Sequence, residues 1–235
     1  MTSTFSRRRI ARHRDTPPAT LAALATDLDI TVRRYVATNP NTPVSTRVAL
    51  ATALDIRYVR EKVAANPYTP PEILAALADD IWDVRWFLAG NPNTPPPTLA
   101  ALGADPATSI RRHVATNPNT PADTLTALGT DPGYDPEVYW HVARNPNTPD
   151  TVLRALSQNP DTDIATAAAN QRIQRLHHYA NTLPEPDRGH AHLLIDTGFT
   201  GWPDQLAGLL TNQRTITHIH TRSIRPQQHV PSTIT

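Results

Sequence analysis

The 235-residue chain contains no cysteine. Disulfide bonds, thiolate metal sites and cysteine nucleophiles are therefore excluded. Lysine is almost absent too, because Lys62 is the one lysine among 22 basic residues. Arginine is thus the abundant cation, and any charged recognition depends on arginine, histidine and the carboxylates.

Long apolar stretches are also missing. No segment approaches the length of about 20 apolar residues that spans a bilayer. The first residues, "MTSTFSRRRIARHR", lack the apolar core of a secretion signal. We therefore expect a soluble protein of the cytoplasm that does not bind a membrane.

The chain holds 24 prolines against 8 glycines, and many of the prolines recur at a fixed period. The pentapeptide NPNTP stands at 39–43, 91–95, 117–121 and 145–149, and NPYTP stands at 66–70. Counted between the threonines of successive Thr-Pro pairs, from Thr16 on, the spacings are 26, 27, 25, 26 and 28 residues. A period of this length indicates an array of structural repeats.

Each repeat carries two apolar patterns. After each Thr-Pro pair come leucines three residues apart, except that Arg47 replaces one of them, with Val48 beside it as the expected substitute. Before each pentapeptide come apolar residues four apart and an alanine, as in Val114 and Ala115. Residues three or four apart share one face of a helix. We therefore expect two short helices in each repeat, which bury their apolar faces by stacking on neighbouring repeats.

The ends of the array depart from this pattern. Ile10 and Ala11 align with Val36 and Ala37, so the arginine-rich start is expected to be a terminal half-repeat. After Thr148 the leucines persist but the Val-Arg pattern is lost, which is typical of a capping unit. We expect the array to cover residues 1–170, and residues 171–235 to form a small cap with a partly disordered tail.

Within residues 171–235 the pattern is weaker. The sequence predicts a helix that breaks at "LPEP", a short apolar strand or helical turn in "HLLID", and a helix starting near Pro203 and Asp204. The alternation in "TITHIHT" is typical of a strand.

The letters of the pentapeptide indicate where helices stop and start. Asparagine is expected to end one helix in left-handed geometry, and the proline behind it prevents continuation. Threonine is expected to be the N-cap of the next helix, with the second proline in its first turn. In "TPPE", Glu72 would complete a capping box with Thr69.

The unit "VRxxVAxNPxTPxxxLxxLAxD" resembles the variant leucine-rich repeat (LRV) family of bacteria, which is related in style to HEAT repeats. The resemblance rests on five good copies and implies an all-α, right-handed α-solenoid of about six two-helix repeats. In such a solenoid α-helices alternate with short 3₁₀ or α helices. Some members carry a cysteine cluster for an iron–sulfur centre, and without cysteine we expect no such cluster and no other cofactor.

One arginine position recurs in the second helix of four repeats and is tyrosine in the fifth. The residues are Arg33, Arg60, Arg85, Arg111 and Tyr139. Stacking would align the guanidinium groups along a ridge, where they could bind phosphates or carboxylates of a partner. Alternatively, each arginine bonds an aspartate or a helix-end carbonyl of the adjacent repeat. Aspartates near each loop favour this internal ladder: Asp29, Asp55, Asp83 and Asp105.

The positions beside the arginine differ in chemistry from repeat to repeat, and several are large aromatic residues. Exposed aromatics are frequent anchors of protein interfaces, although aromatics also fill gaps between helices. The sequence therefore predicts a partner-binding ridge composed of Arg33, Arg60, Arg85, Arg111, Trp86, Phe87, Tyr139 and Trp140.

Charge is unevenly distributed along the array. Residues 1–62 contain 11 basic and 5 acidic residues, whereas residues 63–170 contain 5 basic and 12 acidic residues. A basic half could bind nucleic acid, but an acidic half on the same face would repel it. This polarity favours a protein partner or head-to-tail self-association.

Sites for metals and catalysis receive little support. Seven of the ten histidines lie in the last third: His177, His178, His190, His192, His218, His220 and His229. No carboxylate cluster accompanies them, which favours surface histidines over a metal site. P-loop, dinucleotide-binding, HExxH and GxSxG motifs are absent. We therefore expect a non-catalytic scaffold for protein binding through the second-helix ridge, with nucleic-acid binding by the basic amino-terminal half as the alternative.

Overall fold

The computed structural model describes residues 2–52, 57–131, 133, 135–185, 187–199, 201 and 205–211. They divide into two compact units, Met1–Ala169 and Asn170–Thr235. Throughout the described residues the regular elements are α-helices, without a strand, which confirms the expected all-α class. None of these helices is both long and apolar enough to cross a membrane.

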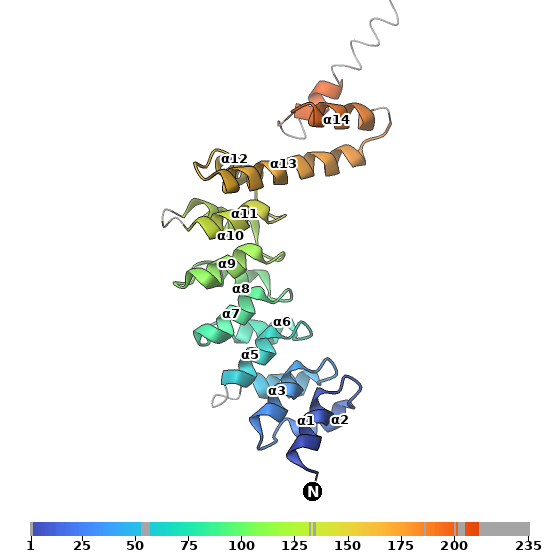
Figure 1. The fold of residues 1–235 in the computed structure, drawn as a ribbon, viewed down its shortest axis with the longest axis vertical. Coiled ribbons are helices and arrows are strands. Elements are labelled where there is room, and N and C mark those ends of the chain that lie inside the picture. The colour runs from blue at the N-terminus through green and yellow to red at the C-terminus, as the bar shows by residue number, and fades with distance from the viewer. Residues whose placement is uncertain are drawn as a thin grey trace, which may run out of the picture. The chain divides into compact units, whose positions relative to one another are not determined.

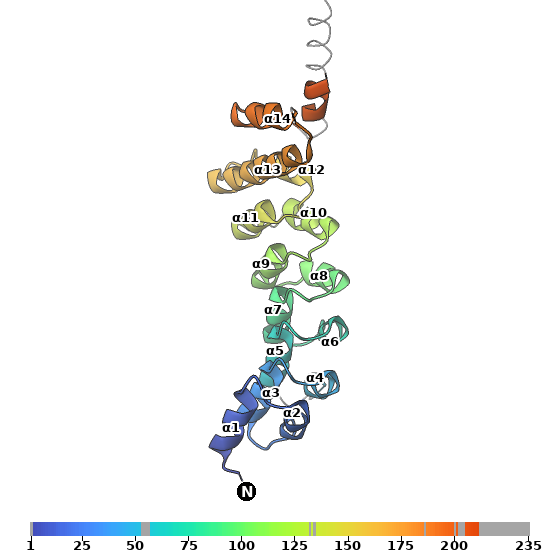
Figure 2. The same ribbon diagram turned by 90° about the vertical axis from the view of Figure 1, so that its right-hand side faces the viewer.

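Helices of the first unit alternate between two rows (Figures 1 and 2). The odd row consists of α1 (Thr4–Arg12), α3 (Ile30–Thr38), α5 (Arg57–Ala65), α7 (Trp82–Gly90), α9 (Thr108–Thr116) and α11 (Pro136–Arg144). The even row consists of α2 (Pro18–Leu24), α4 (Val44–Ala51), α6 (Pro71–Ala76), α8 (Pro96–Gly103), α10 (Ala122–Thr130) and α12 (Asp150–Leu156). Each odd-row helix packs against the next one in its row. The first unit is therefore the stacked α-solenoid that the period predicts.

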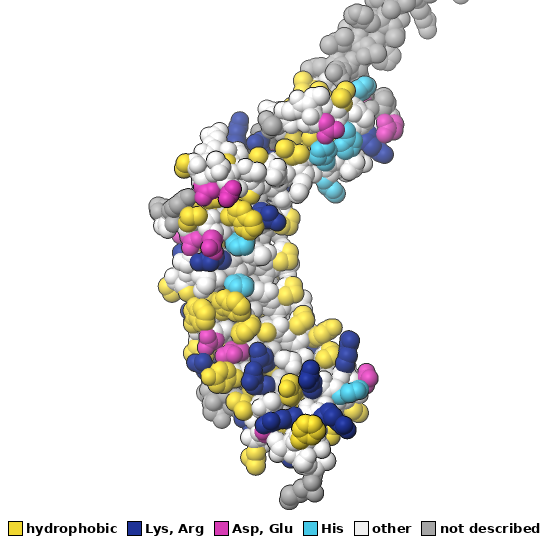
Figure 3. Space-filling model, viewed as in Figure 1, with side chains coloured by type: hydrophobic (Ala, Val, Ile, Leu, Met, Phe, Trp, Pro, Cys, Tyr) yellow, Lys and Arg dark blue, Asp and Glu magenta, His cyan; other side chains and the backbone are white. Residues whose placement is uncertain are grey.

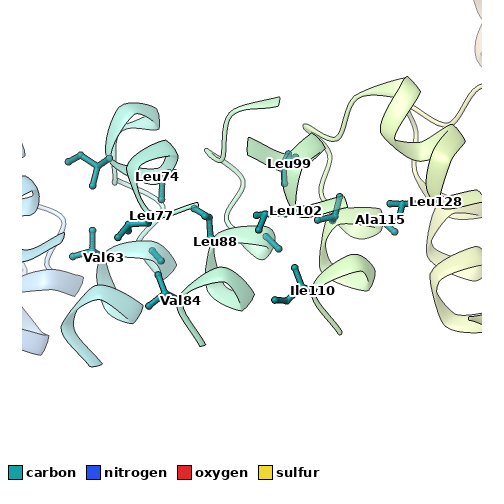
Figure 4. Packing of buried hydrophobic residues seen from close by; sticks show 14 of the residues in the cluster. Val63, Leu74, Leu77, Val84, Leu88, Leu99, Leu102, Ile110, Ala115 and Leu128 are labelled. Atoms are coloured by element: carbon teal, nitrogen blue, oxygen red, sulfur yellow. The ribbon is translucent and has the colours of Figure 1, made fainter. Parts of the chain in front are cut away.

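The core of the array lies between the two rows. Leu74, Leu99 and Leu125 of the even row are fully buried, as are Val84 and Ile110 of the odd row. Figure 4 shows Leu74 and Leu99 on the even row, on the side that faces the odd-row helices of Val84 and Ile110. The three- and four-residue apolar spacings thus mark the buried faces, as expected from helical geometry.

The even-row helices are short α-helices, and hydrogen bonds over three residues, the 3₁₀ pattern, occur at their ends. The N–H of Leu77 donates to the carbonyl of Leu74 at 3.2 Å, and that of Asp105 donates to Leu102 at 3.1 Å. Bonds over three residues tighten the last turn of an α-helix. Of the two helix types that the resemblance allowed in this row, the described residues therefore use the α form.

The threonine of the pentapeptide is not an N-cap, so that prediction was wrong. The N-cap of each even-row helix is the following proline, as in Pro121 of α10, and its first turn receives no side-chain cap. The hydroxyl of Thr120 donates instead to the carbonyl of Val114, six residues earlier, at 2.5 Å. Proline already fixes the backbone at the helix entry, so threonine instead satisfies a carbonyl at the end of the preceding helix. The capping box of Glu72 is likewise not formed.

The first asparagine of the pentapeptide joins neighbouring repeats. It ends the odd-row helix in an extended conformation, with φ −70° at Asn117, so the left-handed geometry was also a wrong prediction. Its amide donates to the carbonyls of Ala89 and Asn91 in the preceding repeat, each at 2.8 Å. Asn117 is 3% exposed. Its side chain therefore makes buried hydrogen bonds between repeats, which a period in the sequence does not reveal.

Arg47 occupies the leucine position of its repeat, and Val48 does not replace it. Arg47 is 4% exposed, whereas Val48 is 45% exposed. The guanidinium donates to the carbonyls of Asn39 at 3.2 Å and Pro40 at 2.9 Å, and also to that of Tyr68. Burial lowers the pKa of Arg47. Arginine is therefore tolerated at this leucine position because backbone carbonyls accept hydrogen bonds from its guanidinium in place of water.

Both ends of the array continue its packing. Ala11 of α1 is fully buried, and the hydroxyl of Thr16 donates to the carbonyl of Ile10, as Thr120 does to Val114. At the other end α13 (Thr162–Thr182) begins with Ile164 and Ala168 in the buried valine positions. The first unit therefore starts with an odd-row helix and ends with the first turns of α13.

The second unit has its own small core. The end of α13, α14 (Asp187–Asp196) and the last described residues contribute Leu176, Ala180, Ala191, Ile195, Leu206 and Leu210. The helix break expected at "LPEP" is present between α13 and α14, and "HLLID" belongs to a helix. Pro203, Asp204 and the expected strand in "TITHIHT" lie outside the described residues.

Candidate interaction surface

In the described part of the chain, two of the four recurring arginines of the odd row pair with aspartates of the next repeat. The side chain of Arg60 bonds Asp80 at 2.6 Å, and that of Arg85 bonds Asp105 at 2.7 Å. Arg7 in the terminal half-repeat pairs with Asp27 in the same way. These contacts match the internal ladder, one of the two interpretations of the arginine positions.

A second set of bonds joins the arginine position to a loop within its own repeat. Arg111 donates to the carbonyl of Asp105 at 2.9 Å, and Arg33 donates to that of Asp27. The hydroxyl of Tyr139 donates to the carbonyl of Asp131 at 2.6 Å. Tyrosine therefore replaces arginine in the fifth copy because it can make the same loop contact.

The aspartates of this ladder differ from those that the sequence favoured. Asp105 is in the ladder, but Asp27 and Asp80 stand where Asp29 and Asp83 were expected, and Asp55 lies outside the described residues. The Arg7 hydrogen bond lowers the pKa of Asp27. Burial alone would raise the pKa of Asp80, but the hydrogen bonds and the charges of Arg60 and Arg85 lower it. Both carboxylates therefore stay ionised and hold their arginines.

Trp86 and Phe87 form an aromatic group on the odd row. Their ring centroids are 4.9 Å apart and nearly perpendicular, and the ring of Trp86 lies 4.4 Å from that of His113 in the next repeat. Lys62 from the preceding repeat stands over the Phe87 ring at 5.2 Å. Gly90 leaves room for this packing, since a Cβ there would approach the His113 ring at 3.0 Å. The rings of Trp86, Phe87 and His113 are half-buried, so they pack between repeats and still present a surface.

Trp140 and His141 form a second aromatic group farther along the row. Their ring centroids are 5.0 Å apart, and the Arg144 guanidinium stands over the Trp140 ring at 4.4 Å. Glu137, near the start of the same helix, pairs with Arg112 of the preceding repeat. This group therefore combines an aromatic ring with charges of both signs.

The two histidines of these groups are held in the neutral form more strongly than a free histidine. Burial is the largest cause that lowers the pKa of His113, followed by the positive charges of His141 and Arg112. Burial likewise lowers the pKa of His141, against the opposing charge of Glu137. At neutral pH the ridge therefore presents uncharged imidazoles beside its aromatic rings.

The odd-row face is chemically mixed. Figure 3 shows basic side chains gathered over the amino-terminal helices, and acidic, histidine and hydrophobic side chains over α9 and α11. Many amino-terminal charges are already paired, as in Arg8 with Asp29 and Arg57 with Asp83. The Arg8 hydrogen bond lowers the pKa of Asp29 to about 2. The basic half therefore carries fewer free cations than its composition indicates.

Histidines of the second unit contact each other but do not form a metal-binding group in the part of the chain that the structure describes. The Nδ1 atoms of His177 and His192 lie 3.0 Å apart, and the Nε2 atom of His192 lies 3.0 Å from the Asn181 side-chain oxygen. His218, His220 and His229 lie outside the described residues. The described contacts join α13 to α14.

Two features of the odd row are not among the predictions from the sequence. The asparagine amides that join repeats had a signal, since asparagine recurs at the same place in every pentapeptide. The acids at the start of α13, Asp161 and Asp163, lie beside Trp140 around a surface cavity of about 350 Å³. For Asp163 there was a signal, because Asp83 and Glu137 likewise stand directly before the first buried apolar residue of their helices.

Comparison with known proteins places the array among repeat proteins. The sequence model described as Leucine Rich Repeat Variant domain matches residues 60–109, and the one described as Leucine rich repeat variant matches residues 109–133. The chain is similar to a solved structure described as a leucine-rich repeat variant with a novel repetitive protein structural motif. The two are 28% identical with a TM-score of 0.54, and the similarity covers 73% of this chain and 67% of that one. No curated protein sequence matches the chain.

Proposed function

Because the repeat array belongs to the variant leucine-rich repeat family, we propose that the chain is a non-catalytic scaffold that binds a protein partner through its odd row. Solenoids supply long surfaces without a catalytic centre of their own. A fold alone does not specify a function, so the binding surface is assigned from its residues. The absence of cysteine agrees with a reducing compartment, and we propose that the protein acts in the cytoplasm.

The observation that carries this proposal is the contrast between constant and variable positions. The constant residues are used inside the array, as the Arg85–Asp105 pair and the Asn117 amide illustrate. The variable positions of the odd row instead display half-buried rings such as Trp86 and Phe87. Rings of this kind bury large apolar area at a small entropic cost, which makes them effective anchors.

The proposed contact surface therefore differs from the ridge that the sequence predicted, because it is centred on aromatic rings and histidines and not on the recurring arginines. Trp86, Phe87, His113, Trp140 and His141 form its centre. The guanidinium groups at the recurring position are engaged within the array, so their role in the proposal is to hold the rings in register. The set concerned is Arg33, Arg60, Arg85 and Arg111. Tyr139 has the same loop-holding role.

Nucleic-acid binding by the amino-terminal half has less support. Arg7, Arg8 and Arg60 pair with aspartates, and Arg47 is buried. Affinity for a phosphate backbone increases with the number of free cations that face it. Paired and buried arginines do not supply such a track.

Site-specific photocrosslinking in the native host tests the proposal. A photoreactive phenylalanine derivative is placed at position 87 on α7, and at position 127 on α10 as the matched control on the exposed even row. We expect a discrete protein adduct from position 87, weakened by Trp86→Ala, and none from position 127. Circular dichroism melts verify that each variant folds. Equal adducts from both positions, or none from position 87, would contradict the proposal.

A further inference from the structure

The cavity beside Trp140 lies at the last junction of the odd row, between α11 and the start of α13. Trp140, His141 and Glu137 line it from α11, and Asp161 and Asp163 line it from α13. Figure 3 shows acidic side chains beside hydrophobic and histidine side chains in this part of the face. The cavity therefore combines an aromatic wall with carboxylates.

At two earlier junctions of the same row an ion-paired arginine occupies this place, and the position holds Arg34, Glu61 or Trp86 at the others. Arg8 and Arg112 stand at the helix position that Trp140 has, two residues before the half-buried Ile10 and the buried Val114 and Val142. Each of these arginines pairs with an acid at the start of the next odd-row helix. Arg8 bonds Asp29 at 2.5 Å, and Arg112 bonds Glu137.

Both acid positions are kept at the last junction, but the arginine is not. Asp161 stands three residues before the buried Ile164, as Asp29 stands three residues before Val32. Asp163 stands directly before Ile164, as Glu137 stands directly before Val138. Among the described residues, no arginine, lysine or histidine forms an ion pair with Asp163. The array thus retains the carboxylates of an inter-repeat ion pair and lacks the cation.

The ring that replaces the arginine is itself a binding surface for a guanidinium. Arg144 already stands over the Trp140 ring at 4.4 Å. Guanidinium groups favour aromatic faces and bond carboxylates with two parallel N–H groups. The arginine side chain of another polypeptide would find an aromatic face and carboxylates together in this cavity. A phosphate would be repelled by the same carboxylates.

We propose that this cavity is the docking site for an arginine side chain of a partner polypeptide, whose guanidinium contacts Trp140 and pairs with Asp163 and Asp161. The inference rests on the proposed function, because it names the chemistry of the partner that the odd row binds. The arginine completes the ion pair that Arg8 and Arg112 complete at earlier junctions.

Titration of the full chain with acetyl-Gly-Arg-Gly-amide tests this site, with the indole N–H signal of Trp140 followed by NMR. We expect saturable binding with a dissociation constant on the order of millimolar, as befits one ion pair on one ring. The lysine counterpart, acetyl-Gly-Lys-Gly-amide, is expected to bind several-fold more weakly, because an ammonium cannot make the bidentate contact. Equal binding of the two peptides would overturn the proposal in favour of general charge attraction.

Variants assign the binding to this cavity. Asp163→Asn is expected to weaken the arginine peptide about tenfold, whereas Asp123→Asn, the same change of an exposed first-turn acid on the even row, is expected to leave it unchanged. Trp140→Arg, in which binding is followed by the NMR signals of the peptide because the indole is gone, is expected to fold and to abolish peptide binding, since it restores the cation that Arg112 supplies one repeat earlier. Binding that survives both Asp163→Asn and Trp140→Arg would overturn the site.

The two proposals fail separately. An absent peptide signal together with a discrete adduct from position 87 would remove the arginine site and leave the scaffold function standing. Peptide binding without any adduct would remove the partner-binding function of the ridge while the cavity keeps its preference for arginine.

Discussion

Arg47 donates from its guanidinium to the backbone carbonyl of Tyr68, and at both of these residues the array departs from its own repeat. Arg47 replaces a core leucine, and Tyr68 replaces the second asparagine of the pentapeptide. In the next repeat that asparagine is Asn93, whose amide donates to the carbonyl of Pro67. The side chain of Tyr68 has no amide that could donate to the carbonyl of Pro40. The Arg47 guanidinium donates to that carbonyl instead, at 2.9 Å. One departure therefore compensates for the other.

A double-mutant cycle tests this compensation. Arg47→Leu restores the leucine column but leaves the Pro40 carbonyl without its donor, and Tyr68→Asn returns an amide that can reach it. We compare the change in unfolding free energy that Arg47→Leu causes in the natural chain and in the Tyr68→Asn variant. We expect that change to favour the folded state by about 1 kcal/mol more in the Tyr68→Asn variant, which is the scale of one hydrogen bond. Urea denaturation of the four proteins gives the coupling free energy. Tyr68→Ala should not provide this rescue, and strict additivity would refute the compensation.

The asparagine that ends each odd-row helix should contribute strongly to stability. Asn117→Ala removes two buried hydrogen bonds to Ala89 and Asn91, so we expect a loss of about 2 kcal/mol in the free energy of unfolding. The matched control is Asn119→Ala, because Asn119 is exposed and donates to Pro92 at the surface. We expect that control to cost well under half as much. Similar losses for the two variants would show that burial of the amide is not the source of stability.

Thr120 should act through its hydroxyl and not as a helix cap. Thr120→Val keeps the volume and removes the bond to the Val114 carbonyl, so we expect a loss of about 1 kcal/mol. Thr130→Val at the exposed end of α10 is the control, since the hydrogen bond from the Thr130 hydroxyl to the carbonyl of Thr126 is exposed to solvent. Thermal and urea unfolding measure both. A Thr120→Val protein as stable as the natural chain would rule out the role assigned to the hydroxyl.

The half-buried histidines of the odd row should make the array sensitive to mild acid. The pKa of His113 and of His141 is lowered from the ordinary value of 6.5, mainly by burial. The unfolded chain then binds protons more readily than the folded chain. Stability is therefore complete above about pH 6.5 and falls as the pH drops below that value.

Urea denaturation between about pH 8 and pH 5 checks this dependence. We expect His113→Phe, which keeps a ring against Trp86, to reduce the slope of unfolding free energy against pH. His190→Gln, at an exposed histidine of the second unit, should leave the slope unchanged. An unaltered slope in His113→Phe would mean that the loss of stability originates elsewhere.

Much of the fold was predictable from the sequence because a repeat presents the same signal several times. The leucine and valine spacings predicted two helices per repeat, and Leu99 and Val114 are buried as those spacings require. The recurrence of one arginine beside the valine left open both a partner-facing ridge and an internal ladder, and of the four aspartates that favoured the ladder, Asp105 pairs with one of these arginines. The local chemistry of the pentapeptide was less predictable, since Thr120 and Asn117 bond groups that come into reach only after the repeats fold and stack.

The sequence by itself determined the period, the helical class, the buried faces and the exclusion of thiol chemistry, because these follow from residue spacing and composition. The tertiary structure decided which aspartate Arg60 contacts, why Arg47 is tolerated at a leucine position, and that Trp140 lines one cavity with Asp161 and Asp163. Each of these depends on atoms that lie one repeat apart along the chain. Only the stacking distance and the angle between helices bring such atoms together, and no local pattern specifies either.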